Sequence, residues 1–186
     1  MGIVKTYSRI KPEFIISIIG LTDKTIVAES LNQASEHFDL DKSWEAPPFL
    51  ITGEKAYFGN HEFSMILLPP NDTIDISEEE YDFYWDNINA ADVNDRSRWN
   101  EIENKKNCNV GYLNRDEVKR LGAVIAHLDM NDLLKQTNLE ILNKNGVYPE
   151  IWTNSLRNKE YIEFHFDALV KFVRRANEAN EFIVIY

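Results

Sequence analysis

Apolar residues recur at helical spacing in two long stretches of the chain. The first follows Asn114, which together with Glu117 has the form of a capping box, so the pattern predicts a helix that starts there. The second runs from Ile162 to Val173, and Arg174 and Arg175 follow it, where positive charge favours the carboxyl end of a helix. Both stretches are predicted to be helices that bury one apolar face.

Near the two ends of the chain the pattern changes to short runs rich in β-branched and aromatic residues. Ile3–Ile10 and Phe182–Tyr186 are predicted as strands. Pro12–Gly20 is predicted as a helix, because proline suits a first turn and glycine a left-handed end, and Thr25–His37 gives a weaker helical pattern. These elements predict an α+β fold, a single compact domain over residues 1–186 with helices packed on a mixed sheet.

The composition shifts between residues 69 and 108. Asp72 to Asp95 contains nine carboxylates and no lysine or arginine, which is typical of a solvated segment. Aromatic side chains are interleaved with these charges, and they argue against a disordered linker. They are Tyr81, Phe83, Tyr84, Trp85 and, further on, Trp99. We therefore expect an ordered excursion with exposed acids.

The charge balance narrows the classes of partner. The chain has 31 acidic and 20 basic residues, a formal charge of −11, which repels phosphate backbones and anionic lipids. We expect no nucleic-acid or membrane partner, whereas a basic protein would be attracted. Cys108 is the single cysteine, so intramolecular disulfides and zinc sites with several thiolates are excluded. With no secretory signal visible, a cytoplasmic location is predicted.

A search for known chemistry finds no complete motif. The seven glycines are spaced so that neither a dinucleotide fingerprint nor a P-loop can be written. His61-Glu62 begins like a zinc-protease helix, but position 65 is methionine, so the second imidazole is missing. The oxygen-rich segments 71–75 and 129–132 lack the central glycine and terminal glutamate of a calcium loop. No cofactor, metal or catalytic residue is predicted from these motifs.

Asp39 and Asp41 are the best paired carboxylates. Two-residue spacing in an extended segment puts both on one face, where they and His37 could line a pocket beside Trp44 and bind a metal or act as acid and base. Helix capping by one of them ahead of Trp44 is the alternative. The next residues, Glu45-Ala-Pro-Pro48, are expected to prevent an uninterrupted helix, because proline lacks the N–H donor.

The chain resembles the YfbM-like family of small bacterial proteins of unknown function. Five segments carry the resemblance in order: Phe38-Asp-Leu-Asp-Lys-Ser-Trp44, Phe49-Leu-Ile-Thr-Gly53, Val110-Gly-Tyr-Leu-Asn-Arg-Asp-Glu-Val118, Val147-Tyr-Pro149 and Tyr161 to Tyr186. The resemblance implies a compact α+β domain and no established activity. Some members are similar to cytoplasmic immunity proteins that accompany antibacterial toxins.

Two departures from the family pattern stand out. Many members carry a histidine after the tryptophan, where this chain has Glu45-Ala-Pro-Pro48, so any chemistry of that histidine would be lost here. The 69–108 excursion is longer and more acidic than the family's usual connection, which suggests a partner-specific surface.

Three hypotheses follow. The first is a non-enzymatic binding protein, an immunity-type protein that neutralises a basic antibacterial toxin by binding it. Its partner-binding residues would be Asp82, Tyr84, Trp85, Asp86 and Trp99. The second is an enzyme of unrecognised type that uses Asp39 and Asp41 in a pocket. The third is a self-associating structural domain.

Overall fold

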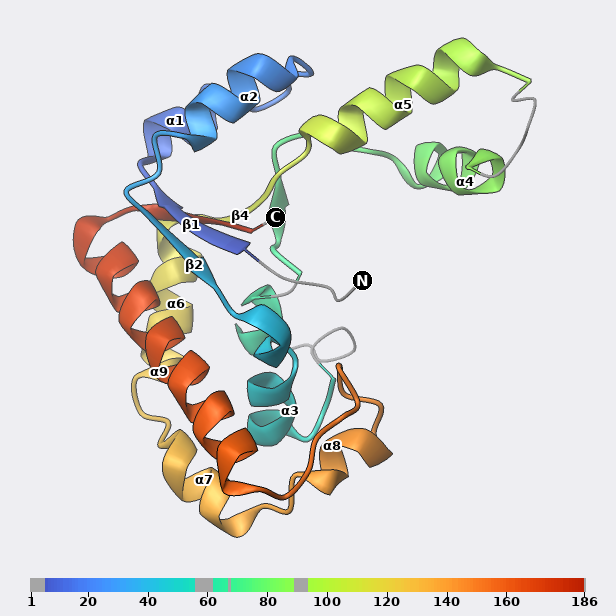
Figure 1. Cartoon of the computed structure of the whole chain (residues 1–186). Helices are drawn as coiled ribbons and strands as arrows, with labels where there is room; N and C mark the ends of the chain where they lie inside the picture. Colours follow the sequence, from blue (N-terminus) through green and yellow to red (C-terminus); the bar gives the residue numbers. More distant parts are fainter. Residues whose placement is uncertain (1–5, 56–61, 67, 89–93, 186) are drawn as a thin grey trace.

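The fold is built on a five-stranded sheet with the strand order β2-β1-β5-β4-β3 (Figure 1). The computed structural model describes residues 6–55, 62–66, 68–88 and 94–185. Every pairing within these residues is antiparallel, with Tyr7 of β1 opposite Ile185 of β5, for example. The strands are β1 (Thr6–Ile10), β2 (Glu36–Asp39), β3 (Asn71–Asp72), β4 (Gly111–Leu113) and β5 (Phe182–Ile185).

The predicted α+β class is confirmed, but the mixed sheet is corrected to an antiparallel one. The two predicted strands are present as β1 and β5, and residues 3–5 and 186 lie outside the described part of the chain. The other three strands are only two to four residues long. Runs this short carry no period from which the direction of pairing could be inferred.

Strand β5 occupies the middle of the sheet and is buried on both faces. Ile183 and Ile185 belong to one apolar core and Val184 to the other, as the alternation of side chains along a strand requires. Helices α6 (Arg115–Ile125) and α9 (Leu156–Ala179) cover the first face. Helices α1 (Pro12–Ile16) and α2 (Lys24–Leu31) cover the second, above the sheet in Figure 1.

Both long helices form where the apolar spacing predicts them. The Asn114 side chain accepts hydrogen bonds from the N–H groups of Asp116 and Glu117, and the Glu117 carboxylate accepts from the Asn114 N–H at 2.7 Å, which completes the capping box. Near the end of α9, Arg175 pairs with Glu36 of β2, so it ties the helix to the sheet edge. Glu36 also pairs with Arg9 of β1.

Two helix predictions are too long. The helix predicted over residues 12–20 ends at Ile16, and turns follow it. The helix predicted over residues 25–37 ends at Leu31, and β2 begins at Glu36, because pairing with β1 outweighs a weak helical pattern. The segment Glu45-Ala-Pro-Pro48 interrupts the helical stretch as expected: Trp44 and Glu45 form a turn, and Pro47 and Pro48 lie in the first turn of a new helix, α3 (Ala46–Thr52), where the missing N–H groups have no partner to lose.

Beyond the sheet, α9 continues into a helical end of the molecule (Figure 1). There it packs with α3, α7 (Met130–Gln136) and the 3-10 helix η1 (Asp41–Ser43), and α8 (Glu140–Lys144) leads into the loop before α9. A second 3-10 helix, η2 (Glu62–Ile66), packs on α6. Two further helices, α4 (Glu78–Asn87) and α5 (Arg96–Cys108), project from the opposite side of the body.

Candidate functional site

The predicted excursion folds as a pair of helices, α4 and α5, that pack against each other. Ser77 and Glu80 form a capping box at the start of α4, and Asp95 caps α5. No described side chain of α4 is buried, whereas α5 is anchored to the body by Cys108, which belongs to the second apolar core, and by Asn104, which donates to the Thr22 carbonyl at 2.9 Å. We call α4 and α5 together the hairpin; residues 89–93 between them lie outside the described chain.

Ion pairs and cation–π contacts join the two helices. Acidic α4 meets basic α5 through Glu80 and Lys105 at 2.6 Å and through Glu79 and Arg98 at 2.7 Å. The salt bridge with Lys105 lowers the pKa of the Glu80 carboxyl. The nine carboxylates of the acidic segment are therefore partly neutralised within the hairpin itself.

Lys106 of α5 lies in a cage of three aromatic rings from α4. Its Nζ is 3.8 Å from the ring centroid of Tyr84, 4.3 Å from Trp85 and 5.3 Å from Tyr81. Burial lowers the pKa of the Lys106 ammonium. The aromatic residues that the sequence offers as partner anchors thus also hold the hairpin closed.

The structure separates the five predicted partner-binding residues into two groups. Trp85 and Asp86 lie three and four residues after Asp82, so all three share an exposed face of α4, with 58% of Trp85 exposed. Tyr84 and Trp99 stack on each other between the helices, with ring centroids 5.5 Å apart. The first group is exposed to solvent, and the Tyr84 ring of the second packs edge-on against Trp85.

The residues of the enzyme hypothesis are not arranged as predicted. The extended segment ends at Asp39, whose carboxylate accepts a hydrogen bond from the Asp41 N–H, and Asp41 lies in η1 with a left-handed φ of 47°. His37 Nδ1 is 2.7 Å from Ser8 Oγ on the neighbouring strand. Asp41 instead accepts a hydrogen bond from the Tyr161 hydroxyl at 2.7 Å. Within the described residues, no three metal-ligating side chains are grouped to hold an ion.

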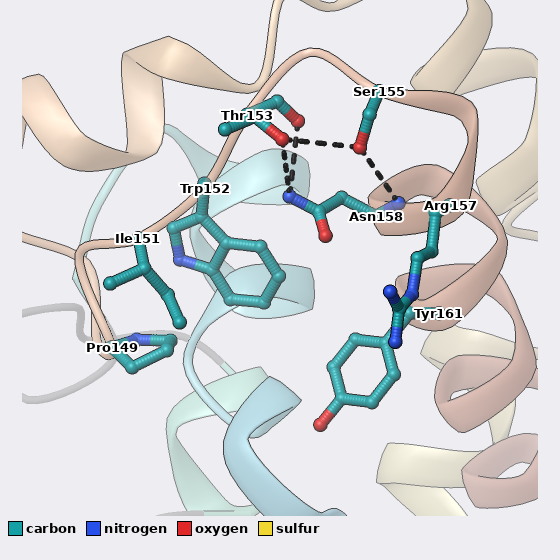
Figure 2. Close-up of a pocket in the computed structure, with 8 residues that line it drawn as sticks. All are labelled: Pro149, Ile151, Trp152, Thr153, Ser155, Arg157, Asn158 and Tyr161. Atoms are coloured by element: carbon teal, nitrogen blue, oxygen red, sulfur yellow. Dashed lines mark hydrogen bonds between the residues drawn. The ribbon is translucent and has the colours of Figure 1, made fainter.

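A groove lies on the other side of Tyr161, where the loop after α8 enters α9. We call it the α9 groove; it has a volume of about 380 Å³ and is shown in Figure 2. One part of its wall is apolar and aromatic, with Trp152 and Tyr161 facing the space, and another part is a cluster of polar side chains (Figure 2). The lining residues are Pro149, Ile151, Trp152, Thr153, Ser155, Arg157, Asn158 and Tyr161.

Several contacts fix the aromatic wall of the α9 groove. The Trp152 indole N–H donates to the carbonyl oxygens of Val147 and Tyr148 at 3.2 and 3.3 Å, and only 3% of the residue is exposed. Tyr148 stacks on Trp44 at a centroid distance of 5.4 Å, and its N–H donates to buried Glu45 at 2.6 Å. The two family-like segments around Trp44 and Tyr148 therefore meet behind this wall.

The sequence did not predict the α9 groove, although two of the family-like segments contain Tyr148-Pro149 and Tyr161. One feature of the sequence could have indicated the groove, namely a tryptophan in the loop just before a helix start. The helix start is marked by Ser155, which caps α9 by accepting a hydrogen bond from the Asn158 N–H. A large aromatic side chain beside a helix start can form one wall of a cleft. The local sequence does not reveal that Asp41, 120 positions earlier, fixes the opposite wall.

Comparison with known families accounts for the whole chain. A family model described as Domain of unknown function (DUF1877) matches residues 1–99 and again 98–186. The chain belongs to this family. The YfbM-like resemblance is thereby confirmed, because the crystal structure of YfbM from Escherichia coli, a protein of unknown function, has the same fold with a TM-score of 0.63 at 17% identity, over 99% of each chain. None of the curated proteins matches the chain.

The two matched segments of this DUF1877 protein are parts of one fold. β1, β2 and β3 come from the first segment, β4 and β5 from the second, and β5 pairs with both β1 and β4. The segments meet at residues 98–99, inside α5 of the hairpin. The family assignment carries no activity, and in the described chain no helix is both long enough and apolar enough to span a bilayer.

Proposed function

We propose that this DUF1877 protein is a non-enzymatic binding protein that recognises a basic protein partner through the exposed face of α4. The observation that carries the proposal is Trp85, a large aromatic side chain 58% exposed and flanked by Asp82 and Asp86. Within the described chain, neither aspartate has a salt-bridge partner. An aromatic anchor ringed by unneutralised carboxylates suits a lysine- or arginine-rich surface.

The organisation of the hairpin supports this use of α4. Glu79 and Glu80 are paired with α5, so their charge is satisfied internally, while Asp82 and Asp86 point their charge outward. Tyr84 and Trp99 stiffen the support beneath Trp85, which reduces the ordering cost of binding. In the finer form of the proposal, the protein is a cytoplasmic immunity-type protein and the basic partner is an antibacterial toxin that it neutralises.

Co-purification from cells that carry the native gene neighbourhood tests the proposal. The wild type should retain a basic protein, preferably the product of an adjacent gene, with an affinity that falls as salt rises. Trp85→Ala should weaken the complex by about 2 kcal/mol or more, and Asp86→Lys should slow association. Glu140→Lys on α8 is the matched control, an exposed charge reversal at the end of the molecule far from the hairpin (Figure 1) that should leave binding unchanged.

Two results would overturn this assignment. One is the absence of any partner under these conditions, and the other is a partner that binds Trp85→Ala and Asp86→Lys as tightly as the wild type. A sizing measurement at several protein concentrations separates the remaining alternative, since a self-associating domain would show a concentration-dependent mass without any partner.

A further inference from the structure

The α9 groove carries a charge opposite to that of the protein. The chain has a formal charge of −11, yet Arg157 is the charged residue among those that line the groove. Among the described ion pairs none involves Arg157, so its guanidinium is available to a ligand. A guanidinium presents donors in a planar fork that matches a carboxylate.

The polar cluster beside Arg157 has one hydroxyl hydrogen in surplus. Asn158 Nδ2 donates to Thr153 Oγ1 at 3.0 Å, and the Thr153 and Ser155 hydroxyl oxygens are 3.1 Å apart, as the dashed lines in Figure 2 mark. A hydrogen bond between two hydroxyls uses one of their two hydrogens, whichever of them donates. The other hydrogen has no acceptor among the described contacts of this cluster, so it can be donated into the groove.

The remaining walls favour a flat apolar group. The Trp152 and Tyr161 rings stand at a centroid distance of 6.4 Å, and each is held by a hydrogen bond to the body of the protein, Tyr161 through Asp41. Because these hydrogen bonds fix both rings, the walls need little reorganisation on binding. A volume of about 380 Å³ lies in the range of small-molecule sites.

We infer that the α9 groove is a binding site for a small carboxylate that carries a flat, apolar body. The carboxylate pairs with Arg157 and accepts the surplus hydroxyl hydrogen of the Thr153–Ser155 pair, while the flat body lies against Tyr161. This site is separate from the face of α4 and does not depend on the proposed protein partner.

Titration with three aromatic acids tests the inference. Benzoate, phenylacetate and indole-3-acetate are added to the full chain at millimolar concentrations, and binding is followed by backbone amide NMR shifts of residues 150–161. At least one acid should saturate and shift these amides. Phenylacetamide, which keeps the shape but not the charge, should bind about tenfold or more weakly than phenylacetate.

Two variants localise the binding. Arg157→Gln should lose about tenfold or more in affinity for the tightest acid, whereas Lys171→Gln, which removes an exposed charge from the same helix, should bind it as the wild type does. Matching amide spectra outside the groove establish that both variants are folded. The inference fails if no acid saturates, if phenylacetamide equals phenylacetate, or if Arg157→Gln retains wild-type affinity.

Discussion

The α6–α9 layer and the hairpin are both helix pairs, but different forces hold them. In the layer, residues such as Leu121, Phe166 and Leu169 are at most 2% exposed and belong to one apolar core. In the hairpin, α4 has no buried side chain, and it contacts α5 through ion pairs, cation–π contacts and the stack of Tyr84 on Trp99. Apolar burial sustains global stability, whereas exposed charge contacts are worth little and are screened by salt. The hairpin is therefore the part of the described chain that can open or adapt at low cost.

The largest expected effect comes from truncating a core ring of α9. Phe166→Ala should lower the free energy of unfolding by about 3–5 kcal/mol, because Phe166 is 1% exposed and stacks on Phe63. Phe164→Ala is the matched control on the same helix; Phe164 is 69% exposed, and its removal should cost about 0.5 kcal/mol or less. Urea unfolding of both variants measures the difference, and equal losses would contradict the assigned burial.

The next effect concerns acid stability at the edge of the sheet. The hydrogen bonds from Arg175, with help from Arg9, hold the pKa of the Glu36 carboxyl below its ordinary value. The lowered pKa contributes stability above the unfolded-state pKa of about 4.3, and this contribution is lost as the pH falls through the folded pKa.

Glu36→Gln should therefore cost about 1–2 kcal/mol at neutral pH and flatten the fall in stability below pH ~4.5. Urea unfolding across this pH range provides the measurement. Glu160→Gln, which alters an exposed carboxylate of α9, should keep the wild-type profile. If the stability of Glu36→Gln fell with pH in parallel with the wild type, Glu36 would not contribute to the acid sensitivity of the fold.

A smaller and purely local effect is expected in the hairpin. Lys106→Met keeps an unbranched side chain of similar length but removes the charge from the cage of Tyr81, Tyr84 and Trp85. The free energy of opening the hairpin should fall by about 1 kcal/mol. Hydrogen exchange of the α4 amides should accelerate while the global unfolding midpoint stays unchanged. Lys119→Met on α6 serves as the control, and unchanged α4 exchange in Lys106→Met would show that the cage does not close the hairpin.

The smallest effect belongs to the most exposed ion pair. Glu79 and Arg98 have side chains 81% and 39% exposed, so Glu79→Gln should change hairpin protection by about 0.5 kcal/mol or less. That difference should vanish in about 1 M salt, where the Debye length is about 3 Å. Salt titration of α4 exchange in both proteins gives the comparison; a salt-independent difference would point to packing instead of charge.

The same contrast explains what the sequence could predict. Helices α6 and α9 could be predicted because both carry apolar residues at helical spacing and because α6 also begins with a capping box. The sequence predicts that the acidic excursion is ordered, but its ion pairs with basic residues of α5 join side chains 19 and 25 positions apart, and the sequence does not reveal them. The packing of α4 on α5 decides which aromatics are exposed: Trp85 remains 58% exposed, and Tyr84 stacks on Trp99 of α5.

The α9 groove escaped sequence reasoning for a different reason. Its lining residues are close in the chain, but the contacts that hold its walls come from Asp41 and Glu45, more than a hundred positions away. The sequence predicts that Asp39 and Asp41 share one face. In the structure the left-handed φ of Asp41 directs the Asp41 carboxylate to the Tyr161 hydroxyl. Long-range pairing of this kind leaves no periodic signal in one sequence.

The place of β5 in the sheet has a consequence for how the chain acquires its fold. β5 is the bridge between the β1–β2 pair and the β3–β4 pair, and its partners in β1 precede it by 172 to 178 positions. Until β5 is available, each pair is an isolated two-stranded ribbon, which is marginally stable at best. Closing so distant a contact is slow, so sheet assembly should be a late step. The ion pairs and cation–π contacts between α4 and α5 join residues at most 25 positions apart, so these contacts do not depend on that late step.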